Sequence, residues 1–578
     1  MKRITYIVIT ALTALTLHSC DFLEVAPQGL LGEEQVKDPS QIESLCVAAY
    51  SALGNDHYDK PFSLWPYGNV RSDDAYKGGN DQTDISAFHF YEISENIKTD
   101  FGEADGLWFF AFEAISRANS ALAVLKAVDA STYPDKEKRM GEMYFLRGHF
   151  YFLLKEVFGH IPFVDEDLPL DAYDKVANTL PNDEQWKLIC GDFQKAFDRL
   201  PNTQPEVGRA NRISAAAYLA KAYLFKAYRQ DERNNVIGTP NADDLEEVLK
   251  YAEIVMSSSY GLEPDMANNF LPGSFQNGKE SLFAVQYSTS DGTMFGRLNW
   301  SDVLSVPMGL GCCDFHKPSQ DLVNAFRTRN GLPCFDDYKE GFLKYTDYDA
   351  TTEAGKKEMA ANEMDPRLFH TVALPGMPYK YNEELIYEKS WNRAPKIYGY
   401  YASLKENVDP SCDCFKNVSP FYANSKNRII LRYADVVLIR AEALIELNRE
   451  GEARPLINQI RERAKSTTFI PYAKNLKISS YPAEGWTQEY ARQALRWERR
   501  LELAMEGQRF FDLVRWGIVA NVMNSYFNTE SIRRDADGEA RTYLKEGKFD
   551  KNQDEYIPIP QQQINFTEGI YQQNPGWK

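Results

Sequence analysis

Residues 432–464 read RYADVVLIRAEALIELNREGEARPLINQIRERA, and this stretch decides the fold class. Apolar residues recur at helical spacing over 432–447, and again over 452–464 after the short turn Arg449-Glu450-Gly451. Two antiparallel helices joined by a short turn form the unit of tetratricopeptide repeats. Because the Trp-Leu-Gly signature of that repeat is missing, the pattern predicts a tetratricopeptide-like hairpin.

Similar helical patterns cover most of the chain outside its middle third. Apolar spacing predicts helices over 136–158, from Asn182 to Pro201, and over 212–229, 243–258 and 487–516. The faces of 212–229 and 243–258 are rich in alanine, which lets neighbouring helices approach closely. We therefore expect a mainly α fold built on a helical hairpin scaffold.

The residue pattern changes from helical to irregular between Gly261 and Asn427. Gly, Pro, Asn and Asp interrupt short strand-like pieces there, such as residues 281–287. Long irregular segments in compact proteins are usually functional or disordered, and the aromatic density here argues against disorder. The predicted organisation is a helical part over 41–260, a variable insertion over 261–427 and a second helical part over 428–578.

The N-terminus has the pattern of an export signal. Lys2 and Arg3 precede an apolar run from Ile4 to Leu17, and a run of about 14 residues is shorter than the ~20 that span a bilayer. The ending Leu17-His18-Ser19-Cys20 resembles a bacterial lipoprotein signal, unless the cysteine stands there by chance. We expect a signal peptide over 1–19, acylation of the Cys20 thiol and a lipidated tether over 20–40. The mature protein would then lie outside the cytoplasm and meet the membrane through its lipid.

The composition excludes some classes of function. A formal net charge of −18 disfavours binding to nucleic acid, which requires a basic footprint. No H-E-x-x-H or G-x-S-x-G motif occurs, so no catalytic residue and no cofactor are predicted. Carboxylate pairs for glycoside hydrolysis stay open, because their geometry is three-dimensional.

Eight cysteines are present, and the seven that follow Cys20 cannot all pair internally. Cys312-Cys313 and Cys412-x-Cys414 are too close together for the usual C-x-x-C metal spacing. We predict no metal site, and buried free thiols for these seven cysteines.

Residues 63–80, SLWPYGNVRSDDAYKGGN, form the best candidate for ligand contact. Trp65, Tyr67 and Tyr76 offer rings to stack on a sugar, and Asp73 and Asp74 offer groups that bind hydroxyls. The alternative is a loop whose rings pack inward and whose acids cap backbone groups. Both alternatives stay open for the two rings Trp65 and Tyr67, whereas adjacent aspartates favour the structural role.

Taken together, the chain resembles the SusD/RagB family of outer-membrane lipoproteins of the Bacteroidetes type, from Cys20-Asp-Phe-Leu-Glu24 to the C-terminus. The order and spacing of several segments carry the resemblance. They are GEMYFLRGHFYFLLKEVFGHIPFV (141–164), GRANRISAAAYLAKAYLF (208–225), DPRL (365–368), RYADVVLIRAEAL (432–444), WERRLELAMEGQRFFDLVRWG (497–517), YIPIPQQQI (556–564) and QNPG (573–576).

The resemblance implies a SusD-like fold, with a tetratricopeptide-like scaffold that carries an irregular insertion rich in loops and short strands. It implies a lid on a SusC-like TonB-dependent β-barrel of the outer membrane, which captures glycan oligomers at the cell surface without catalysis. The run from Trp65 to Asn80, with Trp108, is similar to a subset that includes fructan-binding members. That analogy also places Cys312 and Cys313 near the ligand pocket.

Three other functions remain open from the sequence. The same fold could capture peptides, because some relatives are linked to peptide uptake. The helices could form a protein-interaction scaffold without a small-molecule pocket. The chain could also be a surface glycosidase.

Overall fold

The computed structural model describes residues 38–55, 57–293, 296–335, 348–534 and 537–577. The predicted signal peptide, Cys20 and the first part of the tether lie outside these residues. The described chain is mainly helical with short strands, which confirms the predicted fold class. None of the helices in the described ranges is long and apolar enough to cross a membrane.

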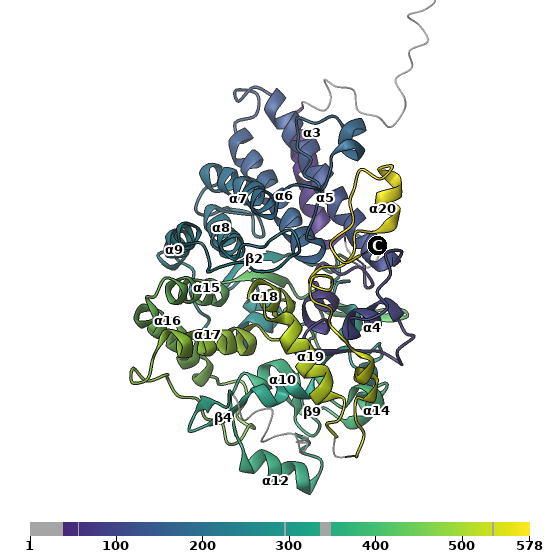
Figure 1. The fold of residues 1–578 in the computed structure, drawn as a ribbon, viewed down its shortest axis with the longest axis vertical. Coiled ribbons are helices and arrows are strands. Elements are labelled where there is room, and N and C mark those ends of the chain that lie inside the picture. Colours follow the sequence, from purple (N-terminus) through teal and green to yellow (C-terminus); the bar gives the residue numbers. More distant parts are fainter. Residues whose placement is uncertain (1–37, 56, 294–295, 336–347, 535–536, 578) are drawn as a thin grey trace, which may run out of the picture.

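The first half of the chain forms a stack of helices in the upper part of Figure 1. Neighbours in sequence pack together, with α5 on α6, α6 on α7, α7 on α8 and α8 on α9. The helices are α3 (Pro39–Ser51), α5 (Gly102–Ala127), α6 (Lys136–Phe158), α7 (Asn182–Arg199), α8 (Arg212–Ala227) and α9 (Ala242–Met256).

Small residues explain the close packing of this stack. Ala215, Ala216 and Ala217 of α8 are fully buried, as their alanine-rich pattern predicts. Gly148 of α6 faces α7 so closely that an added Cβ would lie 3.0 Å from the ring of Phe193. Larger side chains at these positions would push the helices apart.

The predicted hairpin of residues 432–464 is present as α15 (Tyr433–Glu446) and α16 (Glu450–Lys465). Asn448 lies between them with a φ of 60°, in the left-handed region that asparagine tolerates. Helix α17 (Gln488–Leu503) packs on both, and α9 packs on α15. The α9–α15 contact thus joins the two halves of the chain into one scaffold.

The predicted helix over 487–516 is wrong in its middle. Helix α17 ends at Leu503, α18 (Arg509–Arg515) begins six residues later, and Met505 and Gly507 between them have φ values of 63° and 77°. A distant contact sets this break. Gly68 lies against Gly507, where an added Cβ would come within 2.0 Å of the Gly507 carbonyl, and the Asn69 side chain accepts a hydrogen bond from the Gly507 N–H at 3.0 Å.

One antiparallel ladder joins a strand inside the predicted insertion (261–427) to the strand that follows it. Strand β2 (Ser281–Val285) lies in the predicted strand-like piece and pairs antiparallel with β13 (Arg428–Arg432), which leads directly into α15. Strand β1 (Ala75–Gly78) pairs with β3 (Phe315–Pro318), and β11 (Phe415–Val418) forms a hairpin with β12 (Phe421–Asn424).

The remaining elements are short and lie mostly in the lower part of Figure 1. The strands are β4 (Arg327–Arg329), β5 (Leu332–Pro333), β6 (Glu363–Met364), β7 (Val372–Ala373), β8 (Pro378–Tyr379), β9 (Asn382–Ile386) and β10 (Ala402–Ser403). The helices are α4 (Ser86–Ile93), α10 (Gln320–Ala325), α12 (Glu353–Ala361), α13 (Leu368–Thr371), α14 (Pro395–Tyr398), α19 (Val519–Glu530) and α20 (Gln561–Phe566), with a π-helical turn η2 (Trp65–Val70).

The prediction of free thiols is wrong for four cysteines, because Cys312–Cys313 and Cys412–Cys414 form disulfides. Residues one or two positions apart keep their Cα atoms within 3.5 and 5.1 Å, so the sulfurs can meet whatever the surrounding fold. The prediction is confirmed for Cys46, Cys190 and Cys334, which are buried and free.

A buried set of ion pairs ties β13, α16 and α17 together. We call it the arginine cluster and define it as Arg367, Arg432, Arg461 and Arg463 with Glu280, Asp365, Glu498 and Glu502. Arg432 donates to Glu280 at 2.6 Å and to Glu502 at 2.9 Å. Several donors on each guanidinium group meet several carboxylates, which offsets the loss of hydration.

Candidate functional site

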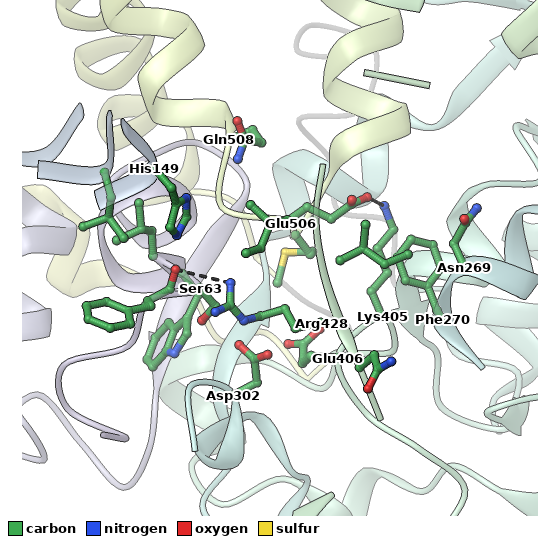
Figure 2. A pocket seen from close by; sticks show the side chains of 18 of the residues that line it. Ser63, His149, Asn269, Phe270, Asp302, Lys405, Glu406, Arg428, Glu506 and Gln508 are labelled. Carbon is green, nitrogen blue, oxygen red and sulfur yellow. Dashed lines mark hydrogen bonds and ion pairs between the residues drawn. The ribbon is translucent and has the colours of Figure 1, made fainter. Parts of the chain in front are cut away.

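A cavity of about 110 Å³ lies where the helical scaffold meets the insertion. Figure 2 shows His149 and Gln508 on one side of it and Asn269, Phe270 and Lys405 on the other. We call it the internal pocket. The residues that line it include Trp65, Glu156, Asp302, Lys405, Lys426 and Glu506.

The break between α17 and α18 supplies part of the pocket wall. Met505, Glu506 and Gln508 all line the cavity, and Lys221 of α8 donates a hydrogen bond to the Gln508 side chain at 2.7 Å. A continuous helix over 487–516 would direct these side chains differently. The contact between Gly68 and Gly507 therefore shapes the pocket as well as the chain path.

Two buried lysines of the insertion differ in their partners. Lys405 donates to a Glu506 carboxylate oxygen at 2.6 Å and to the Glu502 carbonyl at 2.9 Å. Lys426 donates to the Lys405 carbonyl at 3.0 Å and forms no ion pair with a carboxylate in the described part of the chain. Burial lowers the pKa of both ammonium groups, because the cavity wall hydrates charge poorly.

A second polar chain runs through the insertion side of the pocket. The ring of His316 contacts the Glu406 carboxylate at 2.7 Å and the Asn69 side chain at 2.8 Å. Burial alone would raise the pKa of Glu406, yet His316 and the Ser403 hydroxyl hold it below its usual value. This carboxylate is therefore charged and fully engaged at neutral pH.

On the helix side of the pocket, the buried polar groups have fewer hydrogen-bond partners. His149 contacts the Tyr218 hydroxyl at 2.5 Å, and burial lowers the pKa of its imidazole to about 3, so the ring is neutral at pH 7. Glu156 is 7% exposed, and its Oε1 has no hydrogen-bond partner. Burial raises the pKa of this carboxyl to about 8. Glu156 is therefore mostly protonated at neutral pH.

Trp65, a predicted ligand contact, lines the internal pocket at the start of η2. It is 1% exposed, and its Nε1 donates to the Ser301 carbonyl at 3.1 Å. The Ser63 amide also donates to the Ser301 hydroxyl at 3.1 Å. Trp65 thus holds the segment around Ser301 in place.

The other predicted rings lie elsewhere in the interior. Tyr67 packs on Tyr91, with ring centroids 5.4 Å apart, and Tyr76 bonds the buried Glu530. Trp108 of α5 packs edge-on against Phe158, with centroids 5.1 Å apart. The structure does not bring these three rings to the internal pocket.

The two predicted aspartates form ion pairs with arginines on either side of the break between α17 and α18. Asp73 pairs with Arg509 at 2.8 Å, and Asp74 pairs with Arg500 at 2.8 Å. Both carboxylates and Arg500 are buried, and the Arg509 side chain is 12% exposed. The predicted structural role of capping backbone groups is replaced here by long-range charge pairing.

The Cys312–Cys313 disulfide lies beside the β11–β12 hairpin. An added Cβ on the preceding Gly311 would touch the Tyr422 ring, which stacks on Phe415 with centroids 5.5 Å apart. Cys312 is buried and Cys313 is half-buried. Among the described residues, no His, Cys, Asp and Glu side chains gather in a group that could hold a metal ion.

A cluster of surface rings was missed by the sequence reasoning. Phe421 of β12 contacts Tyr58 with centroids 5.0 Å apart and Trp300 with centroids 5.9 Å apart, and all three side chains are half-buried. We call Tyr58, Trp300 and Phe421 the surface ring cluster. Next to Tyr58, the Asp59 carboxylate binds His57 at 2.6 Å and Lys60 at 2.8 Å.

The surface ring cluster and the internal pocket share their supporting segments. Trp300 is two residues from Asp302, which lines the pocket, and Phe421 is five residues from Lys426, which also lines it. The Asn299 amide donates to the Asn424 carbonyl at 2.8 Å and links the two segments. In the sequence, each of these rings is flanked by turn-forming Asn, Asp, Ser or Pro residues, which indicates an exposed loop. That pattern does not reveal which rings meet in space.

Comparison with known families gives consistent matches. Residues 279–577 match the model described as the SusD family, and residues 21–224 match one described as starch-binding associating with outer membrane. Among individual relatives, a SusD-like protein of Formosa agariphila is 25% identical over 100% of this chain and 99% of its own.

Solved structures share the fold. A SusD-like carbohydrate-binding protein of Bacteroides fragilis has a TM-score of 0.70 and 22% identity, over 92% of this chain and 99% of its own. Surface glycan-binding protein A of Bacteroides thetaiotaomicron, in complex with laminarihexaose, has a TM-score of 0.61 and 19% identity, over 93% and 99%.

Proposed function

The chain belongs to the SusD family, and on that premise we propose that it captures oligosaccharides through the surface ring cluster. The observation that supports the proposal is the meeting of three half-buried rings from distant segments beside His57, Asp59 and Lys60. Flat rings stack on the C–H faces of sugars, and charged groups bind the hydroxyls around them. Trp65 has a positioning role in this proposal, because it anchors Ser301 next to Trp300.

The wider biological setting is also a proposal. The protein is anchored to the outer membrane by acylation of Cys20, faces the cell surface and delivers its ligand to a SusC-like TonB-dependent barrel. A fructan-like chain is the proposed ligand class. The family description of outer-membrane association and the glycan-binding relatives support this setting.

The test is binding of the purified protein to a panel of oligosaccharides that includes fructans and laminarin oligomers. Titration calorimetry should detect at least one ligand, and chromatography should recover that ligand uncleaved. Trp300→Ala should weaken binding by about tenfold or more, a loss of at least ~1.4 kcal/mol. Cleavage of the ligand, or binding of peptides alone, would contradict the proposal.

A matched control separates loss of a ring from loss of the site. Trp486 is also half-buried, and its Nε1 donates to the Glu450 carbonyl at 2.8 Å, near α16. Trp486→Ala should leave oligosaccharide affinity within about twofold of wild type. Equal losses in both variants would show that Trp300 acts through general stability.

A further inference from the structure

We propose that the internal pocket is a second binding site, which takes one neutral, sugar-sized polyol. This site goes beyond the proposed capture of oligosaccharides at the surface ring cluster. It stands on a cavity, on a lining that mixes basic and acidic groups, and on two buried polar groups that lack full partners. Figure 2 shows the side chains that face the cavity.

The charges around the pocket favour a neutral ligand. The basic lining groups are Lys221, Lys405, Lys426 and Arg428, and the acidic ones are Glu156, Asp302, Glu406 and Glu506. An anion would approach Lys426 but also meet the carboxyl groups of the lining, and a cation would meet the basic groups. A hydroxyl both donates and accepts hydrogen bonds, so a polyol can use both kinds of partner.

Two groups have unused hydrogen-bonding positions that such hydroxyls could fill. The Lys426 ammonium carries three N–H donors and is 5% exposed, and its one hydrogen bond runs to the Lys405 carbonyl. The Oε1 atom of Glu156 has no hydrogen-bond partner, and the residue is only 7% exposed to solvent. Leaving buried polar groups unmatched is unfavourable, so a ligand that completes them gains affinity.

The shape and the apolar walls fit a sugar ring. The cavity of about 110 Å³ has room for roughly eight waters, at about one per 10–15 Å³. Aromatic side chains complete the wall, namely Phe62, Trp65, Phe152 and Phe270. Rings for the C–H faces and unmatched polar groups for the hydroxyls are the two features a sugar subsite combines.

The test uses D-glucose, D-galactose and D-fructose as probes, with D-glucuronate as the charged comparator. Saturation-transfer NMR and calorimetry on the wild-type protein should detect at least one neutral hexose. Lys426→Met and Glu156→Leu should each weaken that binding by about tenfold or more. Lys465→Met, at an exposed position of α16, is the matched control and should leave it unchanged.

Three results would overturn the inference. The first is the absence of any hexose binding to the folded wild-type protein. The second is hexose binding that survives both pocket variants. The third is glucuronate binding that is tighter than that of every neutral hexose and lost in Lys426→Met. If Lys426→Met does not fold, Glu156→Leu decides between these outcomes. Trp300→Ala should keep hexose binding while losing oligosaccharide affinity, so the two proposals can fail separately.

Discussion

The arginine cluster and the internal pocket are two neighbouring groups of buried charges with opposite behaviour. In the cluster, Glu502 lies against Arg432 and Arg463, and these groups hold its pKa well below the usual value although burial alone would raise it. At two groups of the pocket burial dominates instead, since it lowers the pKa of Lys426 and raises that of Glu156 to about 8. The number of partners, not the number of charges, separates a structural group from one that can receive a ligand.

The choice of side chain explains much of this difference. Arginine presents a planar fork of donors that can bind several carboxylates at once, as Arg432 does with Glu280, Glu502 and Glu506. A lysine ammonium is a compact charge that tolerates a lowered pKa when it is buried. Lys405 links the two regions, since it donates to the Glu502 carbonyl and to the Glu506 carboxylate.

The largest expected effect comes from breaking the cluster. Arg432→Met should destabilise the protein by about 3–5 kcal/mol, because it leaves Glu280 and Glu502 buried with fewer partners. Chemical denaturation measures the free energy of unfolding. A loss below about 1 kcal/mol would show that the cluster is not structural.

An intermediate effect, dependent on pH, is expected in the pocket. The pKa of Glu156 is about 8 in the folded chain, above its unfolded value, so the folded state binds this proton more tightly. Stability from Glu156 is therefore fully present below about pH 4 and is lost as the pH rises through 8.

The Glu156→Gln variant isolates this contribution from other titrating groups. Its free energy of unfolding, minus that of wild type, should rise between pH 5 and pH 8 by on the order of a few kcal/mol, at ~1.4 kcal/mol per pKa unit. Parallel pH profiles for the two proteins would mean that the pocket hydrates Glu156 well.

The smallest effect is expected for an exposed arginine. Arg449 pairs with Glu452 at 2.8 Å, and its side chain is 40% exposed. Arg449→Met is chemically matched to Arg432→Met and should change the free energy of unfolding by less than about 1 kcal/mol. A loss as large as that of Arg432→Met would remove the distinction between buried and exposed pairs.

Local patterns in the sequence predicted the scaffold, and distant contacts produced most of what the sequence could not show. The hairpin of α15 and α16 follows from helical periodicity within 432–464. The break after α17 depends on Gly68, more than 400 residues earlier in the chain. No pattern within 487–516 encodes that contact.

In the candidate site, too, local patterns predicted the residue types, whereas contacts between distant segments decide which residues meet. The run 63–80 contains rings and aspartates suited to sugar, but Arg500 and Arg509 pair with both aspartates in the interior. Tyr58, Trp300 and Phe421 meet only after the insertion has folded back onto the N-terminal loop. Trp65 lay within the predicted run, and its link to Ser301 depends equally on that folding.

The most direct measurement is a crystal structure of the protein with an oligosaccharide that it binds. We predict sugar rings stacked on Trp300, Phe421 or Tyr58, with hydroxyls near Asp59 and Lys60, and the arginine cluster unchanged. An oligosaccharide bound elsewhere on the surface, without contact to any of the three rings, would contradict the central claim.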